Sequence, residues 1–119
     1  VSPSVADDGR PPGLAVRLLR GTFRHDEVAG GLPIGATCTE ACRLTATLTI
    51  ASGVFEGLQA GRGTAELGGR GATYVFVRLA RGARRPLRRG RRVRLLLRVT
   101  ATDAAGHRVF ARRTVVFRR

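Results

Sequence analysis

The amino-acid sequence predicts an all-β protein, an antiparallel sandwich or barrel of about seven strands. Several segments alternate apolar and polar residues with a period of two, as strands with one buried face do. No segment carries apolar residues at helical spacing. Gly clusters at positions 30–31, 61–63 and 68–71 divide the chain into short pieces, which favours strands and turns over long helices.

Four candidate strands lie in the first part of the chain. Residues 14–18 place an apolar residue at every second position. Residues 43–50 show the clearest alternation, with apolar residues on one row and one Arg and three Thr on the other. Residues 54–58 and 64–67 are shorter and weaker candidates.

Three further candidates lie in the last part of the chain. Residues 73–79 carry apolar residues on both rows, which predicts a strand buried on both faces along part of its length. Residues 92–99 place three Arg and one Leu opposite an apolar row, so one face of this strand should contact solvent. In residues 109–117, Arg113 lies on the apolar row, and we expect a bulge or a frayed edge near Arg112–Arg113.

A hairpin should join the last two strands. The run Asp103-Ala104-Ala105-Gly106 lies between them. Asp favours the first position of a type I turn, and Gly supplies the left-handed residue of a following bulge. The sequence therefore predicts a connection of four residues, 103–106.

The chain is long enough for one hydrophobic core and too short for two ordinary domains. Leu, Ile, Val and Phe are about 27% of its 119 residues, above the roughly 20% below which disorder is expected. No apolar run approaches the length of a transmembrane helix. Residues 1–13 are rich in Pro, Asp and Ser and predict a linker or extended lead-in, whereas residues 14–119 predict one domain. The predicted core consists of Leu14, Val16, Leu18, Leu44, Leu48, Ile50, Val75, Val77, Leu79, Val93, Leu95, Leu97, Val99, Val109, Val115 and Phe117.

Positive charge is concentrated at the C-terminal end. The chain has 22 basic residues, all Arg, against eight acidic ones, for a net charge of +14. Residues 81–119 hold fourteen of the Arg and a single acid. Such a patch attracts anions, although a solvated face is the simpler explanation. The candidate polyanion-binding residues are Arg84, Arg85, Arg88, Arg89, Arg91 and Arg92, in a loop spanning 84–94. No aromatic residue lies within this run, so sequence-specific nucleic-acid binding is not expected.

Two cysteines, Cys38 and Cys42, are separated by three residues. They could form a disulfide, half of a zinc site or two free thiols. A structural zinc needs four ligands, and only His25 and His107 are available besides the cysteines. Free thiols would fit a reducing cytosol. We expect the disulfide, which would brace the strand that begins near Arg43 and would indicate a location outside the cytoplasm.

The sequence carries no recognisable catalytic or cofactor motif. Ser52 is not in a G-x-S-x-G elbow, and adjacent His25 and Asp26 would point to opposite sides of an extended chain. The Gly-rich segments are not followed by Gly-Lys-Ser/Thr. The acidic pairs Asp7-Asp8 and Asp26-Glu27 lack the spacing of an EF-hand loop. We therefore expect no enzyme activity, no metal and no cofactor.

Two runs carry a resemblance to a known class of domains. The run from Cys38 to Leu48 resembles the second-strand region of immunoglobulin-like modules in secreted and surface proteins of high-GC actinobacteria. The run from Arg94 to His107 resembles a hairpin common in bacterial immunoglobulin-like and fibronectin-type-III-like repeats, with His107 where Asn is usual. The resemblance implies an immunoglobulin-like β-sandwich that serves as a spacer, adhesion or display module.

Taken together, these observations predict a non-enzymatic structural or adhesion/display module of a larger secreted or cell-surface protein. Its expected partners are neighbouring domains of the same polypeptide, with surface polyanions or a protein ligand as further candidates and no insertion into a membrane. The alternative is a polyanion-binding module that uses the Arg-rich loop. A third interpretation, a cytoplasmic β-barrel associated with ribosomes or DNA, fits the charge but not the cysteine pair or the linker.

Overall fold

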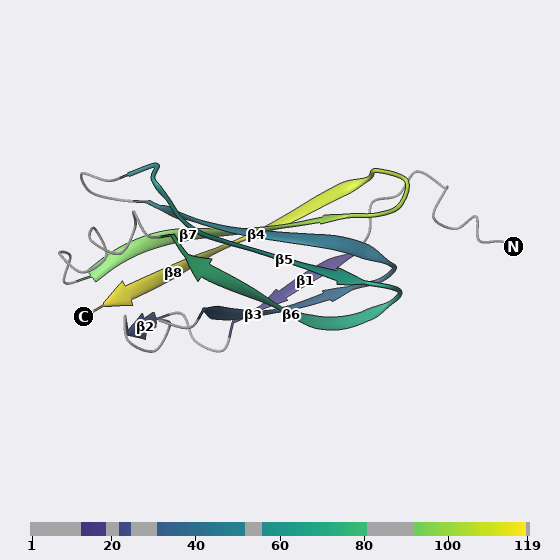
Figure 1. Cartoon of the computed structure of the whole chain (residues 1–119), viewed down its shortest axis with the longest axis horizontal. Coiled ribbons are helices and arrows are strands. Elements are labelled where there is room, and N and C mark those ends of the chain that lie inside the picture. The colour runs from purple at the N-terminus through teal and green to yellow at the C-terminus, as the bar shows by residue number, and fades with distance from the viewer. Residues whose placement is uncertain (1–12, 19–21, 25–30, 52–55, 81–91, 119) are drawn as a thin grey trace, which may run out of the picture.

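The computed structural model describes residues 13–18, 22–24, 31–51, 56–80 and 92–118. These residues form eight β-strands and no helix (Figure 1). Accordingly, no helix that could cross a membrane occurs in the described part of the chain. The strands are β1 (Leu14–Arg17), β2 (Thr22–Arg24), β3 (Leu32–Cys38), β4 (Cys42–Ile50), β5 (Gln59–Leu67), β6 (Gly71–Leu79), β7 (Arg92–Thr102) and β8 (Arg108–Arg118).

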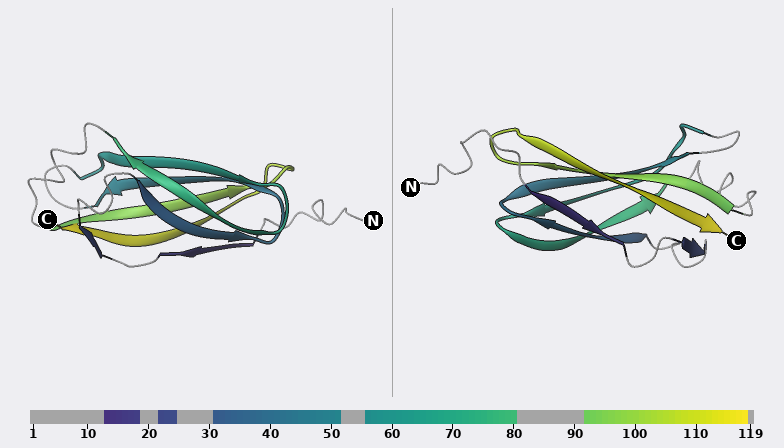
Figure 2. Two further views of the ribbon diagram at one scale, coloured as in Figure 1. Left: turned by 60° about the horizontal axis from the view of Figure 1, so that its bottom comes forward. Right: turned by 180° about the vertical axis from the view of Figure 1, so that it is seen from behind.

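The strands lie in two layers that face each other, as Figures 1 and 2 show. One layer contains β1, β3 and β6, and the other contains β5, β4, β7, β8 and β2 in that order. The layers are joined along one side by β5 and β6, which pair only at Gly61–Leu79 and Arg62–Arg78. All strand pairs are antiparallel except that of β2 with β8. The predicted antiparallel sandwich is confirmed.

The other side of the sandwich contains the two ends of this strand order, β1 and β2. β1 pairs antiparallel with β3 in one layer. β2 pairs parallel with Val116, Phe117 and Arg118 of β8 in the other layer. The N-terminal part of the chain therefore contributes one short strand to each layer. Among the described residues, a strand pairs with the outer side of β8 only near its C-terminal end.

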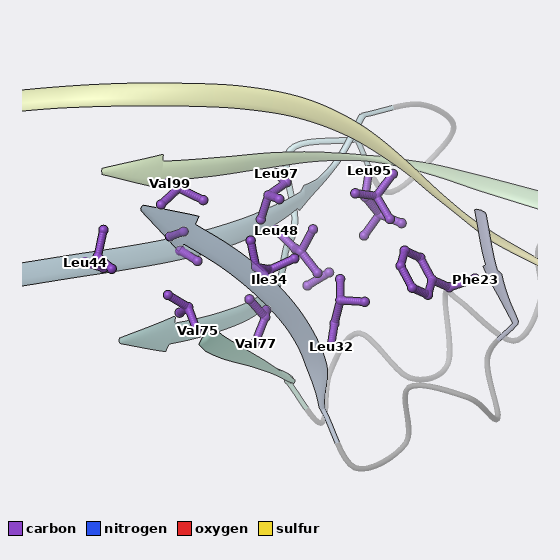
Figure 3. Packing of buried hydrophobic residues seen from close by; sticks show 14 of the residues in the cluster. Phe23, Leu32, Ile34, Leu44, Leu48, Val75, Val77, Leu95, Leu97 and Val99 are labelled. Carbon is purple, nitrogen blue, oxygen red and sulfur yellow. The ribbon is translucent and has the colours of Figure 1, made fainter. Parts of the chain in front are cut away.

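A single core fills the space between the layers (Figure 3). The alternation in β4, where every second residue is buried, places Leu44 and Leu48 inside. Their partners come from both layers, and the fully buried set includes Leu32, Ile34, Val75, Val77, Leu95, Leu97 and Val99. Burial of such apolar surface contributes about 25 cal/mol per Å2 and is the main stabilising term of the fold. Phe23 and Phe117 meet edge to face at one end of the core, with ring centroids 6.4 Å apart.

Most of the predicted core is buried as expected. Leu44, Leu48, Ile50, Val75, Val77, Leu95, Leu97, Val99, Val115 and Phe117 are buried. The remaining predicted residues are partly buried against this core: Leu14, Val16, Leu18, Leu79, Val93 and Val109. The predicted linker, residues 1–13, lies outside the described residues except for Gly13, which is exposed.

Two of the strands, β2 and β3, were not predicted, and β3 was missed because it contains Pro33 and Gly35. Pro removes a backbone donor and is confined to strand edges. The structure satisfies this rule: β1 reaches only Gly35–Cys38 of β3, so Pro33 has Phe76 of β6 on one side and no described strand on the other. The strand supplies the buried residues Leu32 and Ile34, which are not among the predicted core residues.

The β5 region also differs from expectation. Residues 54 and 55 of the predicted strand 54–58 lie outside the described residues, and Glu56 and Gly57 form a turn rather than a strand. The strand begins at Gln59 and includes the predicted 64–67. Its first half requires glycine, because a Cβ atom at Gly63 would overlap the carbonyl of Phe76 in the adjacent strand β6. Because Gly63 has no side chain, β5 can pass close to β6 in one layer while it pairs with β4 in the other layer.

The prediction that residues 73–79 are buried on both faces is wrong. Val75 and Val77 are fully buried, whereas Tyr74 and Phe76 are 58% and 59% exposed. They lie on the outer face of the β1–β3–β6 layer, where no described element covers them. Apolar residues on both rows of a strand therefore indicate two buried faces only when a second layer covers the outer row.

Candidate functional site

The outer edge of β8 is the most distinctive binding feature of the described structure. β7 pairs with β8 along its whole length, from Thr102–Arg108 to Arg92–Arg118. On the other side, β2 pairs only with the last three residues, Val116–Arg118. Among the described strands, none pairs with the eight positions Arg108–Val115 on that side. At about 3.4 Å per residue, this open edge is about 27 Å long.

An open edge of this length presents backbone groups that can bind another strand. In an antiparallel pair, every second residue directs its N–H and C=O toward the neighbour, and the residues between direct theirs away. About four N–H and four C=O groups of Arg108–Val115 therefore point away from β7. β2 already binds the continuation of the same edge, in a parallel orientation. The edge is thus competent to accept a strand.

The turn between β7 and β8 fixes the position of this edge. The predicted hairpin is confirmed: Gly106 has a φ of 89°, and its N–H donates to the Asp103 carbonyl at 3.1 Å. The connection has five residues rather than the predicted four, because His107 is held in the turn. Its backbone N–H donates to Asp103 Oδ1 at 2.8 Å, and its Nδ1 lies 3.0 Å from Oδ2. The first pair of the ladder is consequently Thr102 with Arg108.

The Asp103 carboxyl is the electrostatic centre of this turn. Its side chain is 1% exposed. Burial raises the pKa of Asp103, but hydrogen bonds from the backbone and ring of His107 and a hydrogen bond with the Glu40 side chain outweigh that effect. The net result is a pKa of Asp103 below its ordinary value. The ionised carboxylate therefore holds the turn closed at neutral pH.

Side chains on the outer face of this edge combine an aromatic ring with cations. Phe110 is 49% exposed, and the Arg98 guanidinium of β7 lies over its ring at 4.1 Å from the centroid. Arg98 also lies directly opposite Arg112 in the β7–β8 register. Both of these Arg are exposed.

We expected a bulge or a frayed edge near Arg112–Arg113, and the bulge is wrong. The register between β7 and β8 is continuous through this region. Arg113 lies on the inward row but is exposed, and its Nη1 donates to the Arg112 carbonyl at 2.7 Å. The inward row can accept Arg113 because no described strand pairs with this part of β8 on its outer side, so the side chain reaches solvent. Inward-pointing charges on edge strands oppose indiscriminate strand pairing.

The cysteines form the expected disulfide, Cys38–Cys42. Cys38 ends β3 in one layer and Cys42 begins β4 in the other, so the bond ties the two layers together at one end of the sandwich. Thr39, inside the disulfide loop, exchanges two hydrogen bonds with Gly13: Gly13 N–H donates to Oγ1 at 2.8 Å, and Thr39 N–H donates to the Gly13 carbonyl at 3.1 Å. The loop thereby anchors the start of β1.

An open hollow of about 550 Å3 lies between the disulfide loop and the β7–β8 turn. It reaches the beginning of the β8 edge at Arg108 and also contacts Arg43, whose Nε donates to Glu66 Oε1 at 3.2 Å. Its lining residues are Ala41, Cys42, Arg43, Glu66, Leu67, Thr102, Asp103, Ala104 and Arg108.

The Arg-rich loop predicted as a site falls almost entirely outside the described residues. These contain none of Arg84, Arg85, Arg88, Arg89 and Arg91, whereas Arg92 is exposed at the start of β7. The residues of the β8 edge, Arg108, Phe110 and Arg112, were not identified from the sequence. The signal that could have pointed to them was the mixture of Arg and Phe on the polar row of an otherwise regular last strand.

The sequence matches no protein-family model, and no curated protein matches it. Solved structures of similar fold include the periplasmic chaperone SfaE, with 14% identity, a TM-score of 0.63, and coverage of 89% of this chain and 56% of that chain. Another is a chain from the structure of Salmonella enterica SafA pilin in complex with the SafB chaperone (Type I), with 10% identity, a TM-score of 0.60, and coverage of 89% and 54%. The chain thus spans little more than half the length of each.

These comparisons correct two expectations. The interpretation as a structural spacer or an adhesion/display module, with a polyanion-binding module as the alternative, is wrong, because the similar solved structures are those of chaperones. The expectation of neighbouring domains of the same polypeptide and surface polyanions as partners is also wrong, because one of these chaperones is in complex with a separate pilin chain. What the comparisons establish is the fold: this chain has the immunoglobulin-like β-sandwich of the periplasmic pilus chaperones.

Proposed function

We propose that this protein is a non-enzymatic binding module that receives an extended segment of a separate protein at the open edge of β8. The observation that carries the proposal is the run Arg108–Val115, which pairs with β7 on one side and with no described strand on the other. Peptide recognition by strand addition uses such an edge: main-chain hydrogen bonds supply affinity, and side chains at alternate positions supply specificity.

The two strands beside the edge support this function. β2 shows that the β8 edge binds a strand, and it leaves eight positions open for a second one. β1 lies near β8 in the opposite layer, and its Leu14 and Val16 are only partly buried, as is Val109 of β8. An added strand would cover these apolar side chains with its inward row, which adds burial to the main-chain hydrogen bonds.

The comparisons support a partner on a separate chain. One similar fold belongs to a chaperone that is in complex with a pilin, and complexes of chaperones with pilins are among the systems in which one chain adds a strand to a sheet of another. We place the protein outside the cytoplasm, because a disulfide persists in oxidising compartments and one structural neighbour is a periplasmic chaperone. An origin in high-GC actinobacteria and a fibronectin-type-III-like type stay predictions from the sequence resemblance.

Peptide selection followed by hydrogen exchange tests this function. A random ten-residue peptide library is selected on the immobilised, oxidised protein, and amide exchange is measured with and without the selected peptide. We expect slower exchange at alternate residues of Arg108–Val115. β5 (Gln59–Leu67), which lies at the opposite side of the same layer from β8, serves as the internal control and should not change. Protection confined to β1 or to the outer face of β6, or the failure of any peptide to be retained, would refute strand addition at β8.

A further inference from the structure

The outer face of the β5–β4–β7–β8 layer is strongly basic. Its outward rows carry eight exposed Arg and, among the described residues, a single acid, Glu66, which pairs with Arg43. That pair is exposed at 72% on both side chains and neutralises little of the face. The eight are Arg43, Arg62, Arg92, Arg94, Arg98, Arg108, Arg112 and Arg118.

The register shows where this charge meets the open edge. On the outward row of β8, Arg108, Phe110, Arg112 and Thr114 follow one another at two-residue intervals. A strand added beside β8 continues these rows, and its outward side chains come within about 5 Å of their cross-strand neighbours. The partner position opposite Phe110 is thus flanked, two residues away on each side, by positions opposite Arg108 and Arg112.

From this arrangement we infer that the partner segment is acidic, with Asp or Glu at two positions four residues apart and an apolar residue midway between them. The inference rests on the proposed strand addition and specifies its partner. The motif, acid–x–apolar–x–acid, reads the same in both directions, so it fits a parallel or an antiparallel strand. The two acids face Arg108 and Arg112, and the apolar residue packs against Phe110.

Repulsion within this basic face lowers the stability of the free protein. Arg98 and Arg112 lie directly opposite each other, and like charges in that position destabilise a sheet. An acidic strand beside Arg112 would relieve the repulsion, whereas a second copy of this chain would place Arg against Arg. The same charges therefore favour an acidic partner and oppose edge-to-edge self-association.

Synthetic peptides and two matched double variants test the inference. Fluorescence anisotropy measures binding of the full protein to a ten-residue peptide containing Glu-Thr-Val-Thr-Glu and to the same peptide with Gln in place of both Glu. Two exposed ion pairs predict that the Glu peptide binds roughly 2- to 30-fold more tightly at low salt. The difference should shrink in 0.5 M salt, where the Debye length is only about 4 Å.

The variants separate local pairing from general charge attraction. R108Q/R112Q should lose most of the preference for the Glu peptide, whereas R70Q/R78Q, with the same change in net charge, should keep it. Arg70 lies in the β5–β6 turn and Arg78 on β6, so neither is on β8. Equal affinity for both peptides, or equal loss in the two variants, would overturn the inference while leaving strand addition intact. Binding of neither peptide would overturn strand addition itself and the inference with it.

Discussion

The disulfide allows a direct quantitative prediction of the free energy of unfolding. It closes a loop of only five residues, Cys38–Cys42, between the two layers. In the chain-entropy treatment, a five-residue loop stabilises the folded state by about 2 kcal/mol, at the low end of natural disulfides. Reduction removes this cross-link without removing side-chain atoms, so the free energy of unfolding should fall by about that amount. With a urea m-value of about 1–3 kcal/mol/M, the unfolding midpoint should fall by roughly 1–2 M.

The same bond should have a local effect, because the loop anchors β1. Thr39 exchanges two hydrogen bonds with Gly13 at the start of that strand. We therefore expect faster amide exchange at Gly13 and Thr39 in the reduced protein, with little change at the central amides of β4 and β7. The assay is urea unfolding and hydrogen exchange on oxidised and reduced samples, with C38A/C42A as a form that cannot reoxidise. A midpoint that is the same in all three samples would refute the assigned role of the disulfide.

Three further predictions concern the core, the turn and the basic face. Phe117→Ala should cost about 3–5 kcal/mol, because Phe117 is the largest fully buried side chain, and a loss below about 1 kcal/mol in urea unfolding would contradict the packing described. The pKa of Asp103 is lowered in the folded protein, so its stabilising effect is present above the ordinary value of 3.8 and is lost as the pH falls through the folded value. The melting temperature of wild type should therefore decline at acidic pH more steeply than that of Asp103→Asn, and parallel pH profiles would exclude this role. Arg112→Glu should stabilise the free protein by about 0.5 kcal/mol at low salt, since it faces Arg98; Arg70→Glu controls for net charge, and an equal gain in both would show that the cross-strand pair is unimportant.

The alternation of apolar and polar residues was sufficient to predict a two-layer fold, but not every strand in it. β4 and β7 are regular because each has one face on the core and one in solvent, so the period of two is visible in the sequence. β3 was not predicted because Pro33 and Gly35 are unfavourable within a strand. Pro33 is tolerated because it lies beyond the end of β1, and this position is defined only once the strands have paired. Whether a segment such as β3 forms a strand therefore depends on its pairing with residues that are distant in the sequence.

The candidate site at the β8 edge could not be located from the sequence, although the last strand is regular. A four-residue turn at 103–106 would have placed Arg98, which faces outward, opposite Ala111, which lies on the inward row of β8. Retention of His107 in the turn by Asp103 shifts the register by one residue and brings Arg98 opposite Arg112. From the sequence, the candidate anion-binding site was placed in the Arg-rich loop, whereas the described basic face is assembled from two pairs of consecutive strands, β4–β5 and β7–β8, that are separated in the sequence.

The most direct test of strand addition is a nuclear Overhauser measurement on the isotopically labelled protein bound to the Glu-Thr-Val-Thr-Glu peptide. Strand addition predicts cross-strand contacts between peptide backbone protons and the amide protons of alternate residues in Arg108–Val115, with none to the β1 backbone. Contacts confined to the exposed rings of Tyr74 and Phe76, or to the hollow beside Asp103, would contradict strand addition at β8.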